Sequence, residues 1–289
     1  MSMKLMTDNT ADLPLSYIEE NNIGILTLPC NLDGVIYDEN NMLDSKTFFH
    51  KMRNGSMPTT SQVNPQEAKS RMEAYVKEGC QEILYLAFSS GLSGTYNSVR
   101  IAAEEIMSEY QNVNIQVVDT LCASLGEGLL VYLTVEEMKK GKSMAEIVSF
   151  VKDTIPHIIH IFTVDDLNHL HRGGRVSKAT AVIGTLANIK PILHVDDQGH
   201  LISLTKARGR KKSLTALVDI MEESMGSYKE KNGIFMITHG DCQEDAEFLA
   251  NAITKRFGIK DCMINPLGAT IGAHTGPGLV ALFFLGDAR

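Results

Sequence analysis

The sequence lacks the features that mark several large classes of protein. No apolar stretch approaches the ~20 residues of a membrane-spanning helix, and apolar runs such as 129–135 and 279–285 have the length of core segments. The opening residues, MSMKLMTDNTADLP, contain none of the apolar stretch of a signal peptide. The formal net charge of −8 argues against a nucleic-acid scaffold, which needs a basic surface. We therefore expect no integral membrane segment and no nucleic-acid partner.

Cysteine is sparse, and its spacing excludes two further classes. The cysteines occur singly, without any C-x-x-C pair; they are Cys30, Cys80, Cys122, Cys242 and Cys262. This pattern is typical neither of a zinc site nor of a disulfide framework. Because single cysteines fit a reducing compartment, we expect a cytoplasmic protein that holds no metal and no cofactor.

The residues that are present predict a soluble α/β protein. At 289 residues, with 44% apolar and 21% charged residues, the chain is long enough for one large domain or two ordinary ones. Strands that alternate with helices in the first half predict a parallel sheet with helices on both faces. The expected strands are 4–7, 25–29, 83–88 and 114–119, and the expected helices are 65–78, about 99–110, 124–139 and 144–155.

The pattern changes after Pro156, where we place a domain boundary. Expected strands at 189–195 and 201–205 flank DDQG at 196–199, which predicts a hairpin and hence a mixed sheet. The prediction is an N-terminal α/β/α lobe, 1–156, and a C-terminal mixed α/β lobe, 157–289. A cleft between lobes is a common ligand site. The other expected elements are strands 158–164, 234–238 and 262–266 and helices 214–224 and 244–256.

A serine- and glycine-rich turn separates the apolar strand 83–88 from the helix that follows it. Residues 89–95 read SSGLSGT, and ligands of open parallel sheets bind beyond the carboxyl ends of strands. The backbone N–H groups of Gly94 and Thr95, together with the positive end of the helix dipole, would favour an anion there. The Ser93 hydroxyl could contact that anion or serve only as a helix cap.

Two other stretches offer polar side chains to such a site. Residues 58–62, PTTSQ, place Thr60 and Ser61 between two helical patterns, and taken alone this stretch is better explained as an ordinary capping loop. Residues 268–278, GATIGAHTGPG, form a tightly turned backbone with one titratable side chain, His274. The glycines allow a ligand to approach this histidine closely, which favours a functional role over a structural one.

Two basic clusters stand out in an acidic chain. Arg172 and Arg175 lie in the turn HRGGR and could hold a phosphate or a carboxylate. The run 206–212, KARGRKK, carries five positive charges, among them Arg208 and Arg210. Such a run is usually a solvated face. Its contrast with the net charge also makes it a candidate docking surface for an acidic partner.

The turn at 89–95 also allows an enzymatic interpretation. The residues around Ser93 nearly match the G-x-S-x-G nucleophile elbow of α/β-hydrolases, and His274 follows in their chain order. The fifth position is Thr95, however, where the elbow calls for glycine. Only position in the chain favours Asp241 or Asp261 as a third member of a triad. We therefore expect no enzyme, and keep a serine hydrolase using Ser93 and His274 as an alternative.

Together these motifs resemble the DegV family of bacterial fatty-acid-binding proteins, whose FakB members serve a fatty acid kinase. The matching stretches run through nearly the whole chain in the order expected for the family. They are TDNTADLP from Thr7, TSQ from Thr60, SSGLSGTY from Ser89, VVDT from Val117, LHRGGRVS from Leu170, KPIL from Lys190 and HTGPG from His274.

The resemblance implies two α/β lobes with one long-chain fatty acid buried in and between them. It implies that Thr60 and Ser93, with their neighbours Ser61 and Gly94, hold the carboxylate, and that His274 belongs to the same polar network. The implied partner is a fatty acid kinase, which converts the presented carboxylate into an acyl phosphate for phospholipid synthesis. A carrier of another lipid carboxylate is the second alternative.

Overall fold

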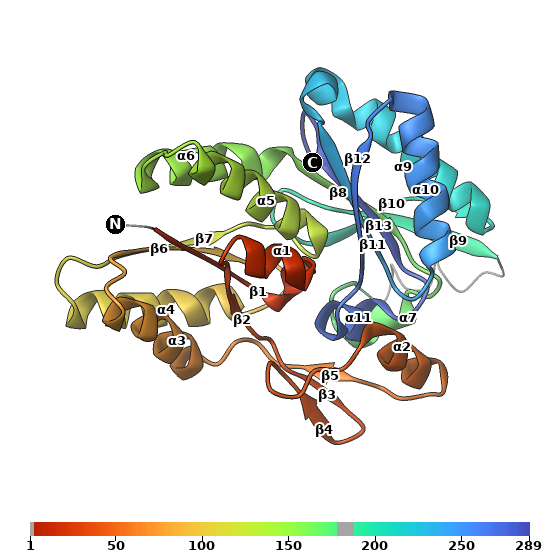
Figure 1. Ribbon diagram of the computed structural model, residues 1–289. Helices are drawn as coiled ribbons and strands as arrows, with labels where there is room; N and C mark the ends of the chain where they lie inside the picture. Colours follow the sequence, from red (N-terminus) through yellow and green to blue (C-terminus); the bar gives the residue numbers. More distant parts are fainter. Residues whose placement is uncertain (1–2, 178–187) are drawn as a thin grey trace.

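The computed structural model describes residues 3–177 and 188–289. Its N-terminal lobe contains a sheet of parallel strands in the order β2-β1-β6-β7 (Figure 1). Helices α3 (Pro65–Lys77) and α4 (Thr95–Glu109) cover one face, and α5 (Leu125–Lys139) and α6 (Met144–Thr154) lie on the other. The predicted architecture of this lobe is confirmed. Its strands are β1 (Lys4–Asp8), β2 (Gly24–Leu26), β6 (Glu82–Ala87) and β7 (Asn114–Asp119).

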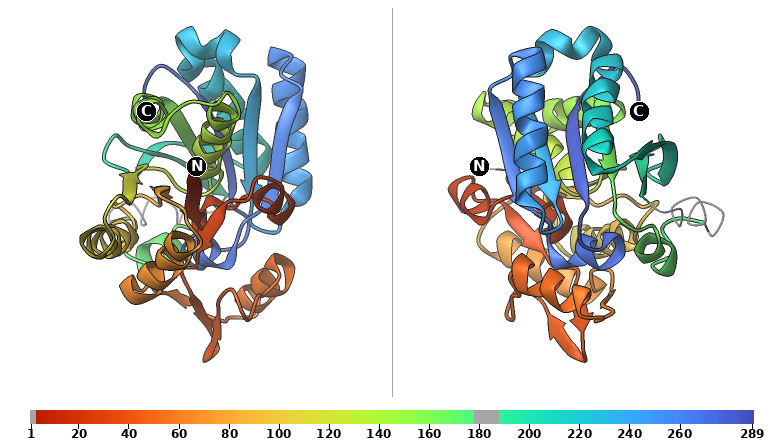
Figure 2. Two further views of the ribbon diagram at one scale, coloured as in Figure 1. Left: turned by 60° about the vertical axis from the view of Figure 1, so that its left-hand side comes forward. Right: turned by 90° about the vertical axis from the view of Figure 1, so that its right-hand side faces the viewer.

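The C-terminal lobe contains a mixed sheet in the order β10-β9-β8-β13-β11-β12. Strands β11 and β12 pair in parallel, and the other neighbours are antiparallel, including the predicted β9–β10 hairpin. Helices α9 (Arg210–Met225) and α10 (Gln243–Phe257) cover the outer face of this sheet (Figure 2). The strands are β8 (Ile158–Thr163), β9 (Ile189–Val195), β10 (Leu201–Arg208), β11 (Ile234–His239), β12 (Asp261–Pro266) and β13 (Val280–Leu285).

Strand β13 is absent from the sequence prediction, in which 279–285 is only an apolar run. The strand lies between β8 and β11 and is antiparallel to both. Leu282 and Phe284 are buried on one face of the sheet, and Ala281 and Phe283 are buried on the other. A strand that is buried on both faces shows no alternation of polar and apolar residues. Its pattern therefore does not distinguish it from a buried helix.

A small antiparallel sheet, also unpredicted, projects from the N-terminal lobe (Figure 1). Its strands have only two or three residues, which is too short for a periodic pattern: β3 (Cys30–Leu32), β4 (Val35–Tyr37) and β5 (Thr59–Thr60). The expected domain boundary at Pro156 falls within the 3₁₀ helix η2. The remaining short elements are α1 (Leu15–Glu20), α2 (Ser45–Arg53), α7 (Asn168–Arg172), α11 (Ala269–Thr275), η1 (Asn9–Ala11), η2 (Ile155–His157) and η3 (Gly226–Lys231).

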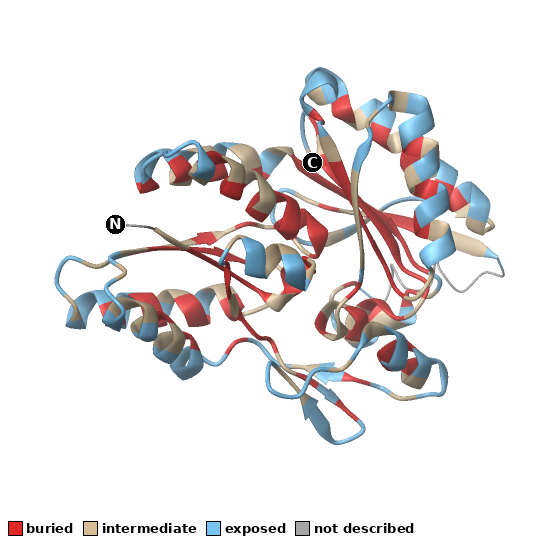
Figure 3. Ribbon diagram, viewed as in Figure 1, coloured by how far each residue is buried: buried red, intermediate tan, exposed pale blue. Residues whose placement is uncertain are grey.

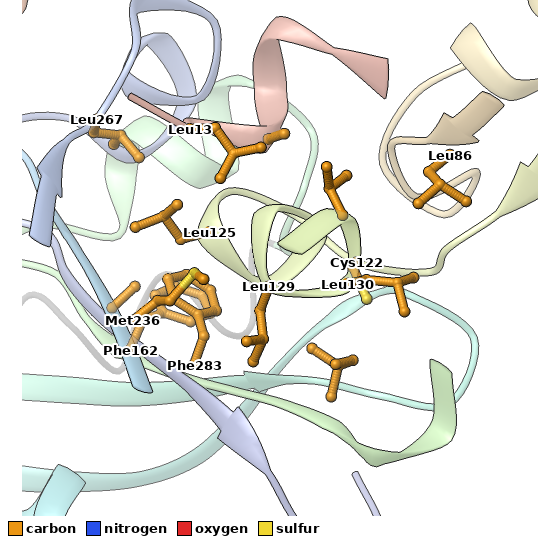
Figure 4. Packing of buried hydrophobic residues seen from close by; sticks show 14 of the residues in the cluster. Leu13, Leu86, Cys122, Leu125, Leu129, Leu130, Phe162, Met236, Leu267 and Phe283 are labelled. Atoms are coloured by element: carbon orange, nitrogen blue, oxygen red, sulfur yellow. The ribbon is translucent and has the colours of Figure 1, made fainter. Parts of the chain in front are cut away.

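Helix α5 lies between the two sheets and packs against both. The strands that flank it are buried almost throughout, whereas the outer helices are exposed on their solvent face (Figure 3). Figure 4 shows Leu125, Leu129 and Leu130 of this helix among residues from both sheets, namely Leu86, Phe162, Met236 and Phe283. A helix that is apolar on all sides needs burial on all sides. The two lobes therefore share one hydrophobic core.

In the described part of the chain, no helix is both long and apolar enough to cross a membrane. The cysteines are all free thiols, and the described His, Cys, Asp and Glu side chains form no group of three or more that could hold a metal ion.

A buried pair of carboxyl groups, Asp8 and Glu127, lies where β1 meets α5. Asp8 accepts hydrogen bonds from the backbone N–H groups of Thr10 and Phe88, each at 3.1 Å, from the Tyr85 hydroxyl at 3.1 Å, and from the Thr10 hydroxyl. A carboxyl group that accepts from so many donors is best satisfied as an anion.

Glu127 has the opposite environment. The Thr7 hydroxyl oxygen lies 2.8 Å from the Leu86 carbonyl and 2.6 Å from Glu127 Oε1. A carbonyl only accepts, so the single hydroxyl proton of Thr7 goes to Leu86, and the second contact needs a proton on Glu127. Burial, and then the charge of Asp8, raise the pKa of Glu127 well above its usual range. Burial raises the pKa of Asp8 as well, but the hydrogen bonds that Asp8 accepts oppose that shift, so we infer a neutral Glu127 beside an ionised Asp8.

This assignment predicts different outcomes for two isosteric changes. Glu127→Gln keeps a neutral group that can donate to Thr7, whereas Asp8→Asn places an N–H₂ group among donors. Folding at a pH above the usual glutamate pKa requires the wild type to take up a proton at Glu127. The stability of E127Q relative to wild type should therefore rise by about 1.4 kcal/mol per pH unit above pH ~5. Urea denaturation from pH 5 to 8 measures the free energy of unfolding of both proteins. A difference between them that does not change with pH would refute a neutral Glu127.

Candidate functional site

The carboxyl ends of β1, β6 and β7 point toward the C-terminal sheet (Figure 1). Residues of both lobes line a cavity of about 270 Å³. The cavity has polar residues at one end and a mainly apolar wall contributed by both lobes. The polar lining residues include Thr60, Ser61, Gln62, Ser93, Arg175 and His274, with Gly94 beside them, and the apolar wall includes Leu28, Phe88, Leu92, Phe162, Leu170, Leu201, Ile271, Leu279, Ala281 and Phe283. The residues singled out from the sequence for the carboxylate site therefore line one cavity.

Thr60 and His274 come from distant parts of the chain and meet at this cavity. Thr60 ends the short strand β5, and its hydroxyl oxygen lies 2.7 Å from Nε2 of His274 in α11. Gly173 packs against the opposite side of the imidazole. A Cβ atom at position 173 would overlap Nδ1 of His274. Burial, and then the charges of Arg175 and Arg172, lower the pKa of His274 to about 4. The imidazole is therefore neutral at pH 7.

The turn before α4 uses Ser93 in two ways. Its hydroxyl oxygen lines the cavity and also accepts a hydrogen bond of 3.2 Å from the backbone N–H of Thr95, the first residue of α4. From the sequence we expected the backbone N–H of Thr95 to be free to bind an anion. That expectation is wrong, because this N–H already donates to the Ser93 hydroxyl. Gly94 leaves room for the Gln62 side chain, whose amide donates to Ser98 at 2.8 Å. The positive end of the helix dipole still faces the cavity.

The geometry does not provide a catalytic triad. His274 contacts Thr60, and no hydrogen bond between Ser93 and His274 occurs among the described residues. The two candidate acids lie elsewhere, because Asp241 pairs with Arg53 and Asp261 is exposed at the start of β12. The hydrolase alternative therefore loses its supporting arrangement.

The four arginines considered for partner docking have different environments. Arg208 is exposed on β10, and Arg172 is exposed with its guanidinium 2.9 Å from Nδ1 of His169. Arg175 is half-buried and donates to the Leu92 carbonyl from two nitrogens, at 3.0 and 3.2 Å. Arg210 pairs with Asp245 at 2.8 Å. Only the first two thus present their charge to solvent.

The sequence analysis did not identify the contribution of the C-terminal sheet to the cavity. Phe162, Ala281 and Phe283 form part of its wall, and Thr238 on β11 adds a hydroxyl group. Alternation along β8 and β13 could have indicated which residues share a face, but β13 was not recognised as a strand.

Comparison with known proteins identifies the family. The family model described as "Uncharacterised protein, DegV family" matches residues 2–287. The chain belongs to the DegV family. It is 47% identical over 287 residues to a DegV domain-containing protein of Clostridium perfringens, covering 99% of this chain and 98% of that protein.

Solved DegV structures have the same two-lobe fold. A DegV protein from Thermus thermophilus, described as fatty acid binding, superposes with a TM-score of 0.87 at 29% identity, covering 99% of this chain and 100% of the other. A fatty acid binding DegV protein from Streptococcus agalactiae gives 0.85 at 30% identity, covering 99% of each chain. The two-lobe α/β architecture expected from the resemblance is thus confirmed.

The environment of His274 predicts an acid-dependent loss of stability. Its pKa is lower in the folded protein, about 4, than the value near 6.5 of an unfolded histidine. The contribution of neutral His274 to the free energy of unfolding is fully present above pH ~6.5. It is lost as the pH falls toward 4, by about 3 kcal/mol at most. His274→Gln removes this titration, so the stability of the variant relative to that of the wild type should rise as the pH falls. Urea denaturation from pH 7.5 to 4 measures this, and parallel curves would show that His274 titrates normally.

Proposed function

We propose that this DegV protein binds one long-chain fatty acid and presents its carboxylate to a fatty acid kinase in the cytoplasm. The observation that supports the proposal is the cavity itself, in which an apolar wall adjoins a small set of neutral hydrogen-bonding groups. The descriptions of the solved relatives as fatty acid binding point to the same ligand. In this role the protein is a carrier and not an enzyme.

The acyl chain supplies the affinity in this proposal. Burying about fifteen methylene groups at ~0.8 kcal/mol each contributes roughly 12 kcal/mol before the costs of association. That term alone is sufficient for tight binding. The polar groups then have a different task, which is to hold the carboxylate at one end of the cavity and so fix the orientation of the lipid.

The carboxylate lies, in our proposal, among Thr60, Ser61, Ser93, Gly94 and His274. These groups are neutral, since the pKa of His274 is lowered to about 4. Arg175 also lines the cavity and lowers that pKa, and its Nε, Nη1 and Nη2 atoms each donate one hydrogen bond to the carbonyls of Leu92 and Gly173. Because none of these neutral groups forms a salt bridge with the carboxylate, its oxygen remains available to attack the γ-phosphate of ATP held by the kinase, with ADP as the leaving group.

A basic surface adjoins this end of the cavity. Asp165 packs against Gly278 in the loop after His274, and it pairs with Lys190 at 2.6 Å. Lys190 lies opposite Ala207 in the β9–β10 ladder, so the end of β10 reaches the same edge of the sheet. We place the docking surface for the kinase on the exposed residues Lys206, Arg208, Lys211, Lys212 and Arg172. Arg175 and Arg210 are at most helpers, because both are engaged within the protein.

The purified protein should carry one long-chain fatty acid, and denaturing mass spectrometry of extracted lipid tests this directly.

The double variant Thr60→Ala/Ser93→Ala removes two hydrogen bonds to a charged group, each contributing about 1.5–3 kcal/mol at most. Its affinity for the acid should therefore fall, whereas affinity for the corresponding fatty alcohol should change little. A titration with both ligands measures the difference.

Two outcomes would contradict this site. Equal losses for acid and alcohol would mean that the substitutions damaged the cavity and not an anion site. Stoichiometric labelling of Ser93 by a fluorophosphonate, with turnover of a short-chain ester, would instead support the hydrolase. Lipid other than a fatty acid in the purified protein would favour a carrier of another lipid carboxylate.

Reversing charge on the docking surface should slow acyl-phosphate formation without weakening lipid binding. Lys206→Glu/Arg208→Glu removes the complementary field that speeds encounter with an acidic kinase surface. The defect should shrink as salt rises, because screening lowers the wild-type rate toward that of the variant. Lys255→Glu/Lys260→Glu makes the same change in net charge in the last turn of α10 and just after that helix, and is the matched control. Equal rates for both variants would place the docking surface elsewhere.

A further inference from the structure

The cavity extends away from the carboxylate site along the inner face of the C-terminal sheet. Leu279, Ala281 and Phe283 alternate along β13 and the residue before it, and all three line the cavity. Leu279 follows closely after α11, which carries His274, so Phe283 lies further from the carboxylate site. His160 of β8 pairs with Phe283 in the strand register, and the two rings are in edge-to-face contact with centroids 5.3 Å apart. We call the region of His160 and Phe283 the inner end of the cavity.

The loop 120–124, between β7 and α5, contributes to the wall at this inner end. Ala123 and Ser124 line the cavity, and the backbone N–H of Ala123 donates a hydrogen bond of 3.2 Å to Nε2 of His160. The Nδ1 atom of the same ring donates to the Ile158 carbonyl at 3.0 Å, so the ring is held at both nitrogens. The position of His160 in the wall therefore depends on the position of the loop.

The backbone of this loop has a conformation that needs support from its neighbours. Leu121 has a φ angle of 52° and Ser124 has a φ angle of 55°. Positive φ angles are unfavourable for residues that carry a side chain, and such strain persists only where surrounding groups hold it in place. The N-terminal lobe gives part of this support, because the Cys122 carbonyl accepts from the backbone N–H of Ser89 at 3.0 Å. Further support comes from a segment that is distant in the sequence.

Arg289, in the segment that follows β13, holds the loop with its guanidinium group. Its Nη1 atom donates to the Leu121 carbonyl at 2.6 Å. Its Nη2 atom lies 3.3 Å from the Thr120 carbonyl oxygen and 2.9 Å from the Cys122 sulfur. Nη2 also lies 2.7 Å from the Ile155 carbonyl oxygen in η2. Hydrogen bonds from a charged donor are the stronger kind, so one guanidinium ties three consecutive loop residues to the junction between the lobes.

The segment 286–289 is itself anchored before it reaches the loop. The backbone N–H of Asp287 donates to the Ser224 carbonyl at 3.1 Å, and the Asp287 carboxylate accepts from the backbone N–H of Ser227 at 3.0 Å. Gly226 packs so closely against this carboxylate that a Cβ atom at position 226 would overlap it. The guanidinium at the end of the segment therefore acts from a fixed position.

We infer that Arg289 is a positioning residue for the inner end of the cavity, which holds the loop 120–124 in place and so limits the length of the acyl chain that the cavity accepts. The identity of the ligand rests on the proposed function, whereas the support of the loop does not. The charge of Arg289 also adds to burial in lowering the pKa of His160 well below its usual range. A neutral ring suits a wall that contacts the tail of an acyl chain.

Alkylation of Cys122 by iodoacetamide tests the support of the loop without any lipid. Cys122 is fully buried, so its thiol reacts only when the loop opens, and Cys30, which is 2% exposed in β3, is an internal control. Arg289→Met removes hydrogen bonds from a charged group, so Cys122 should react about tenfold or more faster while Cys30 keeps its rate. Arg256→Met, which removes the same charge from an exposed ion pair on α10, is the matched control.

The preference for chain length is the second measurement. Wild-type protein should bind hexadecanoic acid more tightly than docosanoic acid in a titration, because further methylene groups overpack a fixed wall. In Arg289→Met this preference should shrink about tenfold, since a released loop makes room for a longer tail. Leu249→Ala destabilises the protein at a buried position of α10 that is not among the described residues lining the cavity, and should leave the preference unchanged.

Each result supports or overturns the inference. Faster alkylation confined to Cys122, together with a weaker preference for the shorter acid, supports it. An unchanged rate at Cys122, or an equal acceleration at Cys122 and Cys30, would overturn the positioning role, because the second result reports global unfolding. An unchanged preference in Arg289→Met would overturn the limit on chain length. If neither acid binds wild-type protein, the proposed function fails and the limit on chain length fails with it, whereas the alkylation rates still decide whether Arg289 holds the loop.

Discussion

Two buried aspartates, Asp8 at the end of β1 and Asp12 directly after η1, fix the position of the site, and the rest of the cavity depends on them. Asp8 accepts from the backbone N–H of Phe88 and so fixes the point at which the serine-glycine turn begins. Asp12 accepts from the backbone N–H of Gly268 and so fixes the start of the helix that carries His274. Side chains that hold backbone N–H groups in place set the position of every residue that follows within a turn or two. The stretch TDNTADLP thus positions both halves of the proposed carboxylate site without contacting the ligand.

The shared core gives the cavity its second wall. Because α5 packs against both sheets, the inner face of the C-terminal sheet is held opposite the carboxyl ends of the N-terminal strands. Ala281 lies between Phe162 and Thr238 in the strand register, and its small side chain leaves space where a larger one would fill the cavity. Neither lobe forms this cavity alone, which explains why its lining residues are spread over most of the chain.

The sequence predicts the elements better than it predicts their contacts. Periodicity and turn residues are sufficient for the parallel sheet, the β9–β10 hairpin and the motifs that line the cavity. The contact between Thr60 and His274 joins residues 214 positions apart, and no local pattern specifies it. Local sequence likewise does not show which charged side chains are paired in the folded protein. The run 206–212 reads as one basic cluster, yet Arg210 pairs with Asp245 on another helix while Arg208 remains exposed.

The proposed carboxylate site relies on hydroxyl groups and a neutral imidazole, because Arg175, which also lines the cavity, donates to the carbonyls of Leu92 and Gly173. A guanidinium or ammonium group in contact with the anion would strengthen binding, but both charges would then be desolvated and the carboxylate oxygens would be occupied. Neutral hydroxyl groups and a neutral imidazole hold the anion more weakly and leave its oxygens free. That arrangement is tolerable only because the acyl chain already provides the binding energy. In the proposed function, retention of the lipid and accessibility of its carboxylate therefore depend on opposite ends of the same cavity.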